Sequence, residues 1–271
     1  MRILLTGSTG FIGRHLLAYL SRYHDLVAPS SKELDILDTE SVQRFIKASP
    51  YDAVIHAAMA WHEDIYSSMI RAHLNLLSCS NHYGRLVYMG SGAEYGKQYP
   101  IVCAREAEFG LAVPSDPYGL AKYVCNQLSE RYRNVINLRL FGVYGPGEQS
   151  RRFISSAIQD VRLRNAIHIR QDVRFSYLWV GDLARAVQLI LETYTPVNAY
   201  NVVPPEKFTL SEISGIINRV MGSEASIVIQ SPGMNNEYTG DGELFEKHFG
   251  GFDFWSLEKG IENMVDAFAH K

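Results

Sequence analysis

The first half of the chain alternates short aliphatic runs with longer stretches in which apolar residues recur every three or four positions. The short runs predict strands, and the longer period predicts helices. The expected strands are 2–6, 26–28, 52–58, 85–90 and 135–141, with a short further strand at 33–37. The expected helices are 10–22, 38–48, 65–81 and 118–133, the second of them capped by Asp38 or Thr39. Because strands and helices alternate, we expect an α/β protein with a doubly wound parallel sheet.

The pattern changes after residue 147. Further helices are expected at 152–164, 182–194, 213–221 and 257–269, and further strands at 166–169 and 226–229. Thr209 and Glu212 have the spacing of a capping box, in which each side chain satisfies a free backbone N–H at a helix start. We expect residues 1–147 to form the first domain and residues 148–271 a small mixed C-terminal lobe that binds substrate. About residues 175–202 should return to the first domain.

Composition narrows the class of protein. The chain has 26 Lys and Arg against 29 Asp and Glu, a formal net charge of −3, so neither nucleic acid nor a membrane surface is an expected partner. No run approaches the ~18 uncharged apolar residues of a membrane helix. The three scattered cysteines form no disulfide framework, and nothing at the N-terminus resembles a signal peptide, so we expect a cytoplasmic protein. The nine histidines, among them His56 and His62, lack metal-ligand spacing, so no metal site is expected.

Glycines at a spacing of three follow the first expected strand. Gly7 permits a tight turn, Gly10 lets a pyrophosphate approach the backbone, and Gly13 lets helix and strand pack closely. The following helix supplies free N–H groups and a positive dipole end for phosphates. This order predicts a Rossmann-type site for a dinucleotide, and a structural turn is the alternative. The expected loop contacts are Gly7, Ser8, Thr9, Gly10, Phe11, Ile12, Gly13 and Arg14.

The end of the second expected strand bears on which dinucleotide binds. A carboxylate there usually holds the ribose diol of NAD. This chain offers Ser30, Ser31 and Lys32 instead, and Arg14 follows the glycine loop. Hydroxyls and cations suit a phosphate better than a diol, so NADP(H) is expected ahead of NAD(H). The alternative is that Lys32 and Arg14 are only solvated surface charges.

Tyr118 and Lys122 lie four positions apart at the start of an expected helix, and therefore on one face. A free phenol has a pKa of about 10, and a neighbouring cation lowers it. Tyr118 could therefore exchange a proton with a hydroxyl or carbonyl while Lys122 holds the cofactor ribose. Ser91 follows strand 85–90 at the sheet edge where ligands bind, and its hydroxyl could bind the reacting oxygen. Each signal alone is common, and their order along the chain carries the prediction.

Together these motifs resemble the extended short-chain dehydrogenase/reductases, the NAD(P)-dependent epimerase/dehydratase group that acts mostly on nucleotide sugars. The resemblance covers nearly the whole chain, including segment 138–147 at the entry to the second lobe. It implies a homodimer packed through helices 65–81 and 118–133. It also implies further cofactor contacts from Asp35, Ile36, His56, Ala57 and Ala58.

Departures from the family narrow the expected chemistry. Dehydratases of this family carry an Asp-Glu pair directly after the catalytic Ser or Thr, which is Ser91 in this chain, but here Gly92 and Ala93 follow it. GDP-fucose synthases carry a cysteine two residues after the same position, where this chain has Ala93. Neither dehydration nor double epimerisation is therefore expected. The remaining expected reaction is hydride exchange at one alcohol or ketone centre of a nucleotide sugar, catalysed by a 4-keto reductase or a 4-epimerase. The expectation of NADP(H) favours the reductase. The alternatives are a carbonyl reductase of a non-sugar metabolite and a non-catalytic dinucleotide sensor.

The expected substrate contacts come from both lobes. Arginine grips a diphosphate with paired hydrogen bonds, and Arg174, inside a strand-like stretch, is the strongest candidate. The alternative for the arginines is that they are solvated. The full expected set is Ser91, Gly92, Glu94, Tyr95, Arg151, Arg152 and Arg174.

Overall fold

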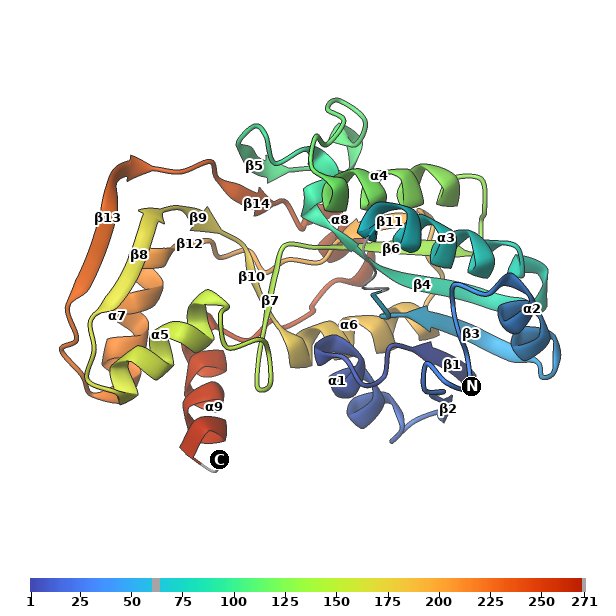
Figure 1. Ribbon diagram of the computed structural model, residues 1–271, viewed down its shortest axis with the longest axis horizontal. Coiled ribbons are helices and arrows are strands. Elements are labelled where there is room, and N and C mark those ends of the chain that lie inside the picture. The colour runs from blue at the N-terminus through green and yellow to red at the C-terminus, as the bar shows by residue number, and fades with distance from the viewer. Residues whose placement is uncertain (60–63, 270–271) are drawn as a thin grey trace.

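The computed structural model describes residues 1–59 and 64–269. Within these ranges, six parallel strands form the central sheet in the order β11-β6-β4-β3-β1-β2 (Figure 1). The strands are β1 (Arg2–Thr6), β2 (Asp25–Val27), β3 (Tyr51–His56), β4 (Tyr83–Ser91), β6 (Val135–Leu140) and β11 (Ala199–Asn201). The strand order reverses at β1, with β2 on one side and β3 on the other, and ligands bind at such a switch point.

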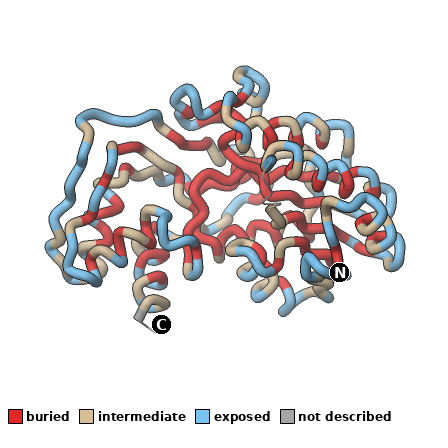
Figure 2. Tube along the Cα trace, viewed as in Figure 1, coloured by how far each residue is buried: buried red, intermediate tan, exposed pale blue. Residues whose placement is uncertain are grey.

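Helices cover both faces of this sheet, which confirms the doubly wound fold. The helices α1 (Phe11–Leu20) and α6 (Val180–Glu192) lie on one face, and α2 (Thr39–Lys47), α3 (Ile65–Leu77) and α4 (Pro117–Ser129) lie on the other (Figure 1). Along β1, Ile3 and Leu5 pack toward α1, while Leu4 packs toward α2 and α3. Because both faces are covered, the strands are buried along most of their length (Figure 2).

The second lobe is smaller and mixed, as expected. Its helices α5 (Phe153–Arg162), α7 (Leu210–Met221) and α9 (Leu257–Ala269) pack together beside the parallel pair β8 (Ile167–Asp172) and β13 (Ile227–Met234). The capping box of α7 is present, because Thr209 Oγ1 accepts from Glu212 N and Glu212 Oε2 accepts from Thr209 N. None of the helices in the described ranges has the length and apolarity needed to cross a bilayer.

The chain passes between the lobes several times. A four-stranded mixed sheet consists of β12 (Phe208–Thr209), β9 (Arg174–Phe175), β14 (Tyr238–Gly240) and β5 (Ile101–Ala104). The pair β7 (Gly142–Tyr144) and β10 (Tyr177–Trp179) joins the lobes. After β10 the chain returns as α6 and β11, and α8 (Glu243–Phe249) also packs in the core of the first lobe.

The expected strand at 33–37 is wrong. This segment forms turns, with Asp35 Oδ1 accepting from Leu37 N and with Leu34 buried against α2. The apolar residues that suggested a strand anchor a loop instead. That loop lines the pocket described next.

Candidate active site

The glycine loop after β1 forms a backbone cradle. Gly7 adopts a positive φ of +76°, and a Cβ there would collide with the backbone of Ala57 and Ala58. A Cβ on Gly13 would collide with the backbone of Gly7, so this glycine allows α1 to pack against the loop. Helix α1 starts at Gly10 without a side-chain cap, so its first N–H groups stay free for an anion. The cradle therefore fits a dinucleotide pyrophosphate.

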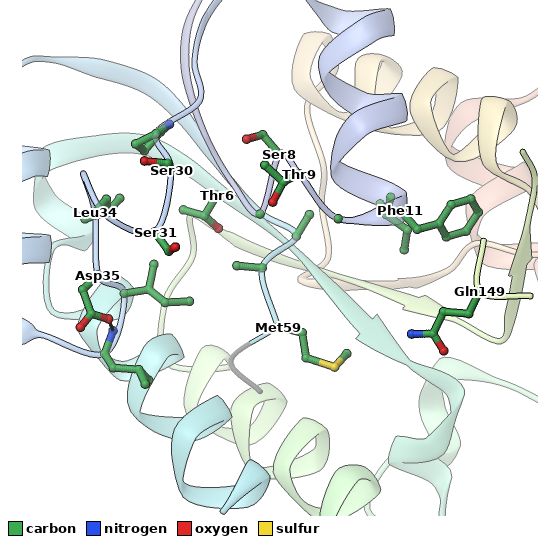
Figure 3. Close-up of a pocket in the computed structure, with 18 residues that line it drawn as sticks. Thr6, Ser8, Thr9, Phe11, Ser30, Ser31, Leu34, Asp35, Met59 and Gln149 are labelled. Carbon is green, nitrogen blue, oxygen red and sulfur yellow. Dashed lines mark hydrogen bonds between the residues drawn. The ribbon is translucent and has the colours of Figure 1, made fainter. Parts of the chain in front are cut away.

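A pocket of about 570 Å³ lies over this loop, within the range typical of small-molecule sites. It extends from Ser30, Ser31 and Asp35, past the glycine loop and Met59, to Gln149 (Figure 3). Of the expected cofactor contacts, those lining it are Gly7, Ser8, Thr9, Gly10, Phe11, Ile12, Ser30, Ser31, Asp35, Ile36, Ala57 and Ala58. The lining residues that were not among the expected contacts are Thr6, Pro29, Leu34, Leu37, Met59 and Gln149.

Arg14 does not face this pocket, which corrects part of the argument for NADP(H). Its Nη2 donates to the carbonyl oxygen of Gly147 at 2.9 Å, across the boundary between the lobes. Lys32 is exposed and is not among the lining residues. A carboxylate lies on the same loop instead, because Glu33 Oε2 accepts from both the N–H and the hydroxyl of Ser30 at 2.8 Å. These hydrogen bonds hold the pKa of Glu33 below its ordinary value.

His56 and Lys122 lie beneath the pocket rather than in its lining. They border a small cavity of about 10 Å³ that shares Ala58 with the pocket. His56 Nδ1 hydrogen-bonds Thr6 Oγ1 at 2.8 Å, and burial lowers the pKa of its imidazole well below the usual value. His56 is therefore buried at the end of β3 and bonded to the end of β1.

The expected catalytic pair lies at the start of α4. Asp116 caps this helix, its Oδ1 accepting from Gly119 N at 2.8 Å, and Pro117 occupies the first turn. Lys122 is buried, and its Nζ donates to the carbonyl oxygen of Met89 in β4 at 2.6 Å. The helix start is thus fixed by its cap, and Lys122 is tied to the central sheet.

Ser91 ends β4 close to a second tyrosine, Tyr238 of β14. Ser91 Oγ accepts from Ala93 N at 3.1 Å and lies 3.3 Å from Tyr238 Oη. Burial raises the pKa of Tyr238, and the charge of Tyr118 raises it further. The structure brings Ser91 and Tyr238 together, and Tyr118 lies at the start of α4, which packs against the turn after Ser91. The sequence analysis missed Tyr238 because no motif surrounds it.

Glu94, Tyr95 and Gly92, three of the expected substrate contacts, are buried and engaged by other residues of the protein. Glu94 is completely buried and pairs with Arg139, Nε to Oε2 at 2.7 Å. Tyr95 is buried with its hydroxyl donating to Asn201 Oδ1 at 2.9 Å. Gly92 lies under the Phe141 ring, where a Cβ would approach the ring atoms to 2.5 Å. All three residues support the turn that presents Ser91.

The three arginines of the expected substrate site have different partners. Arg151 Nε donates to the side chain of Gln149 at 2.9 Å, at one end of the dinucleotide pocket. Arg152 pairs with Glu148, Nε to Oε2 at 3.2 Å. Arg174 in β9 is half-buried, and its Nη1 donates to the carbonyl oxygen of Lys207 at 3.3 Å.

Among residues 1–59 and 64–269 there is no cluster of three His, Cys, Asp or Glu side chains that could hold a metal ion. His62, considered in the sequence analysis, lies outside the described residues.

Comparisons with known proteins place these motifs in context. The model of the NAD dependent epimerase/dehydratase family matches residues 3–203. GDP-L-colitose synthase of Yersinia pseudotuberculosis is 25% identical, with 100% of this chain and 99% of that protein covered. GDP-6-deoxy-D-mannose reductase of Pseudomonas aeruginosa is 26% identical, with 84% and 82% covered. The structure of a GDP-L-fucose synthetase from Naegleria fowleri bound to NADP superimposes with a TM-score of 0.87 at 14% identity, covering 99% and 92%, a likeness that shows the fold alone.

Proposed function

Because the chain belongs to the NAD-dependent epimerase/dehydratase family, we propose that it reduces or epimerises one alcohol or ketone centre of a nucleotide-activated sugar. A 4-keto reductase is the version we favour, since one relative is named a GDP-sugar reductase. The observation that carries the proposal is that α4, which bears Tyr118 and Lys122, packs against the turn after Ser91. Its Lys122 bonds the carbonyl oxygen of Met89, in the strand that Ser91 ends.

Ser91, Tyr118 and Lys122 have different roles in the proposed reaction. When bound, the nicotinamide cofactor supplies or accepts the hydride. The oxygen of Ser91 accepts from Ala93 N and lies 3.3 Å from Tyr238 Oη. Its hydroxyl turns from Tyr238 to donate to the substrate oxygen as negative charge develops there. Tyr118 gives the proton to that oxygen in reduction and removes it in oxidation. Lys122, anchored on Met89, holds the cofactor ribose with its remaining donors.

The cofactor is NADP(H) or NAD(H). Ser30 and Ser31 line the pocket and suit a ribose phosphate, whereas the Glu33 carboxylate on the same loop opposes one. We propose that Arg151, Arg152 and Arg174 of the second lobe face the substrate.

A tyrosine-to-phenylalanine pair tests the proton role. Tyr118→Phe should lower kcat at least about 100-fold while cofactor affinity stays unchanged, because proton transfer typically contributes 10²–10⁴-fold. Tyr123→Phe, a buried tyrosine on the same helix, is the matched control and should keep turnover. Retained turnover in Tyr118→Phe would remove the proposed mechanism.

The substrate class needs a separate experiment. Cofactor-loaded protein should gain thermal stability from at least one nucleoside diphosphate of a panel covering the common bases. If none stabilises it, the substrate is a non-sugar carbonyl compound.

We also propose a homodimer packed through α3 and α4. These helices lie side by side on one face of the sheet (Figure 1). Leu74 of α3 is 44% exposed. Leu74→Arg should shift the mass measured by light scattering from dimer to monomer, and an unchanged mass would place the interface elsewhere.

We propose a cytoplasmic location, because none of Cys79, Cys103 and Cys125 forms a disulfide, as is usual in a reducing compartment. Fractionation of cells that express a tagged chain tests this, and recovery outside the cytoplasm would contradict it.

A further inference from the structure

A second cavity is separate from the glycine-loop pocket, and among the described residues the two share no lining residue. Its volume is about 660 Å³, a size suited to a small molecule. Segments from both lobes line it: the connection from β11 to β12, the start of α8 and the segment before α9. The proposed reaction uses none of these segments, so the cavity is a site without an assigned ligand.

The wall of this cavity carries an excess of negative charge. The charged residues that line it are Glu206, Lys207, Asp241, Glu243, Glu246 and Asp253. Asp241 Oδ2 pairs with Arg105 Nε at 3.1 Å, and Glu246 Oε1 accepts from a backbone N–H at 3.0 Å. Lys207 Nζ donates to the carbonyl oxygen of Pro205 at 3.3 Å, and among the described residues it pairs with no carboxylate. The lining lysine therefore does not neutralise the wall.

Three of the lining carboxylates are left without a partner. Among the described residues, the side chains of Glu206, Glu243 and Asp253 form no ion pair or hydrogen bond. They come from the β11–β12 connection, the first turn of α8 and the segment before α9. Within 1–59 and 64–269, no three His, Cys, Asp or Glu side chains converge closely enough to hold a metal ion. These charges therefore suit a ligand with several separated cations better than one compact ion.

Aromatic rings line the cavity beside the carboxylates. Phe252 and Phe254 have ring centroids 4.6 Å apart, and Trp255 stacks on Trp179 at 5.4 Å, so the rings are fixed by one another. Lys259 Nζ lies 4.1 Å from the centroid of Trp255, which shows that an ammonium group is accommodated at this wall. A ligand could therefore place methylene groups on the rings and ammonium groups at the carboxylates.

We propose that this cavity binds an aliphatic polyamine, a chain of methylene groups with ammonium groups at intervals. The ammonium groups pair with Glu206, Glu243 and Asp253, and the methylene groups pack on the aromatic rings. This inference does not rest on the proposed function, because the cavity and the glycine-loop pocket are lined by different residues.

Cys103 provides a direct readout of whether the cavity is occupied. It lines the cavity and is exposed, whereas Cys79 and Cys125 are buried. N-ethylmaleimide, an uncharged thiol reagent, should therefore modify Cys103 first, as peptide mass spectrometry can show. Spermidine at ten times its Kd leaves about one site in eleven free, so it should slow this modification about 10-fold. Sodium chloride at the same ionic strength should leave the rate unchanged.

Calorimetry with spermidine measures the affinity. Glu206→Gln, Glu243→Gln and Asp253→Asn should each weaken binding about 5-fold, the size of effect of one exposed ion pair, and the triple variant about 100-fold. Butylamine, which has one ammonium group, should bind wild-type protein at least about 10-fold more weakly than spermidine. Glu262→Gln, at an exposed position on α9, is the matched control and should keep wild-type affinity.

Three results would overturn the proposal. One is the absence of spermidine binding to wild-type protein, and another is equal affinity in the triple variant and wild type. The third is protection of Cys103 by sodium chloride or butylamine as strong as that by spermidine, since attraction of any cation would then explain the effect. Thermal melting confirms that each variant is folded. Turnover of a nucleotide sugar enters none of these measurements, so their outcome leaves the proposed function to its own tests.

Discussion

Glu94 is the residue that ties Ser91 to the core. Its Oε1 accepts from Ser91 N at 2.9 Å, and its Oε2 accepts from Arg139 Nε at 2.7 Å and from Asn137 Nδ2 at 2.9 Å. Burial lowers the pKa of Arg139, but the Glu94 charge outweighs it and holds this pKa above its ordinary value. A charged pair shielded from water in this way is costly to break from one side.

Glu94→Gln should therefore destabilise the fold strongly. The neutral amide leaves the Arg139 charge uncompensated, and we expect a loss of about 3 kcal/mol in the free energy of unfolding. Urea unfolding measures it. Glu224→Gln, at an exposed position, should stay within about 0.5 kcal/mol. A loss of the same small size in Glu94→Gln would show that the pair contributes little.

Glu33 should set the balance between the two cofactors. Its carboxylate accepts from Ser30 at the end of the pocket where the second strand meets the ribose. One unit charge about 4 Å away in water is worth about 1 kcal/mol, so Glu33→Gln should raise the affinity for NADP relative to NAD about 5-fold. Binding titrations with both cofactors check this ratio. Glu40→Gln on α2 is the control, and a ratio equal to wild type in Glu33→Gln would contradict the prediction.

The candidate site could be predicted only where side chains belong to motifs. Ser91, Tyr118 and Lys122 stand in a fixed order after recognisable elements, so the sequence indicated them. Tyr238 meets Ser91 only because β14 pairs with β5, a contact between segments more than a hundred residues apart. The sequence also placed Arg14 in the cofactor pocket, since it could not show that this side chain bonds Gly147 instead.

At the level of elements, the long helices and buried strands were predictable and the short strands were not. Helix α2 begins after Asp38, whose side chain accepts from Glu40 N and Ser41 N as its capping pattern predicts. Strands such as β5, β11 and β14 have only three or four residues and no alternating pattern. Their pairing partners, rather than their own residues, decide that they are strands.

Two helix caps allow local stability and catalysis to be separated. Asp38→Ala and Asp116→Ala each remove a side-chain acceptor from a helix start, and each should lower the free energy of unfolding by about 1 kcal/mol. Only Asp116→Ala should also lower kcat/KM, because α4 carries Tyr118 and Lys122. Equal kcat/KM in the two variants would mean that the cap does not position the catalytic helix.

At the scale of the whole molecule, buried neutral histidines link stability to acidity. His73 is 1% exposed, its Nε2 hydrogen-bonds Ser129 Oγ, and burial together with the charge of Lys122 lowers its pKa to about 3. Burial lowers the pKa of His56 in the same way. Below pH ~6.5 these histidines bind protons in the unfolded chain but not in the folded protein. Their contribution to the free energy of unfolding is therefore complete above this pH and is lost progressively toward pH 3.

We expect the free energy of unfolding to fall by up to about 1.4 kcal/mol per pH unit for each of these histidines below pH ~6. Urea unfolding between pH 7.5 and 4.5 measures the slope. His73→Gln should reduce the slope by about 1.4 kcal/mol per pH unit, the contribution of one proton. His82→Gln, at an exposed position, should leave the slope unchanged. An unchanged slope in His73→Gln would show that His73 does not exclude a proton.

The first helix also bonds the turn that leads into the second lobe. Besides Arg14 on Gly147, His15 Nε2 donates to the carbonyl oxygen of Pro146 at 2.9 Å, so the helix that follows the glycine loop holds two successive carbonyls of the crossing segment. Binding of the pyrophosphate to that loop would therefore make the segment that leads to Arg151 and Arg152 more rigid. The expected kinetic signature is compulsory order, with the coenzyme arriving first and leaving last.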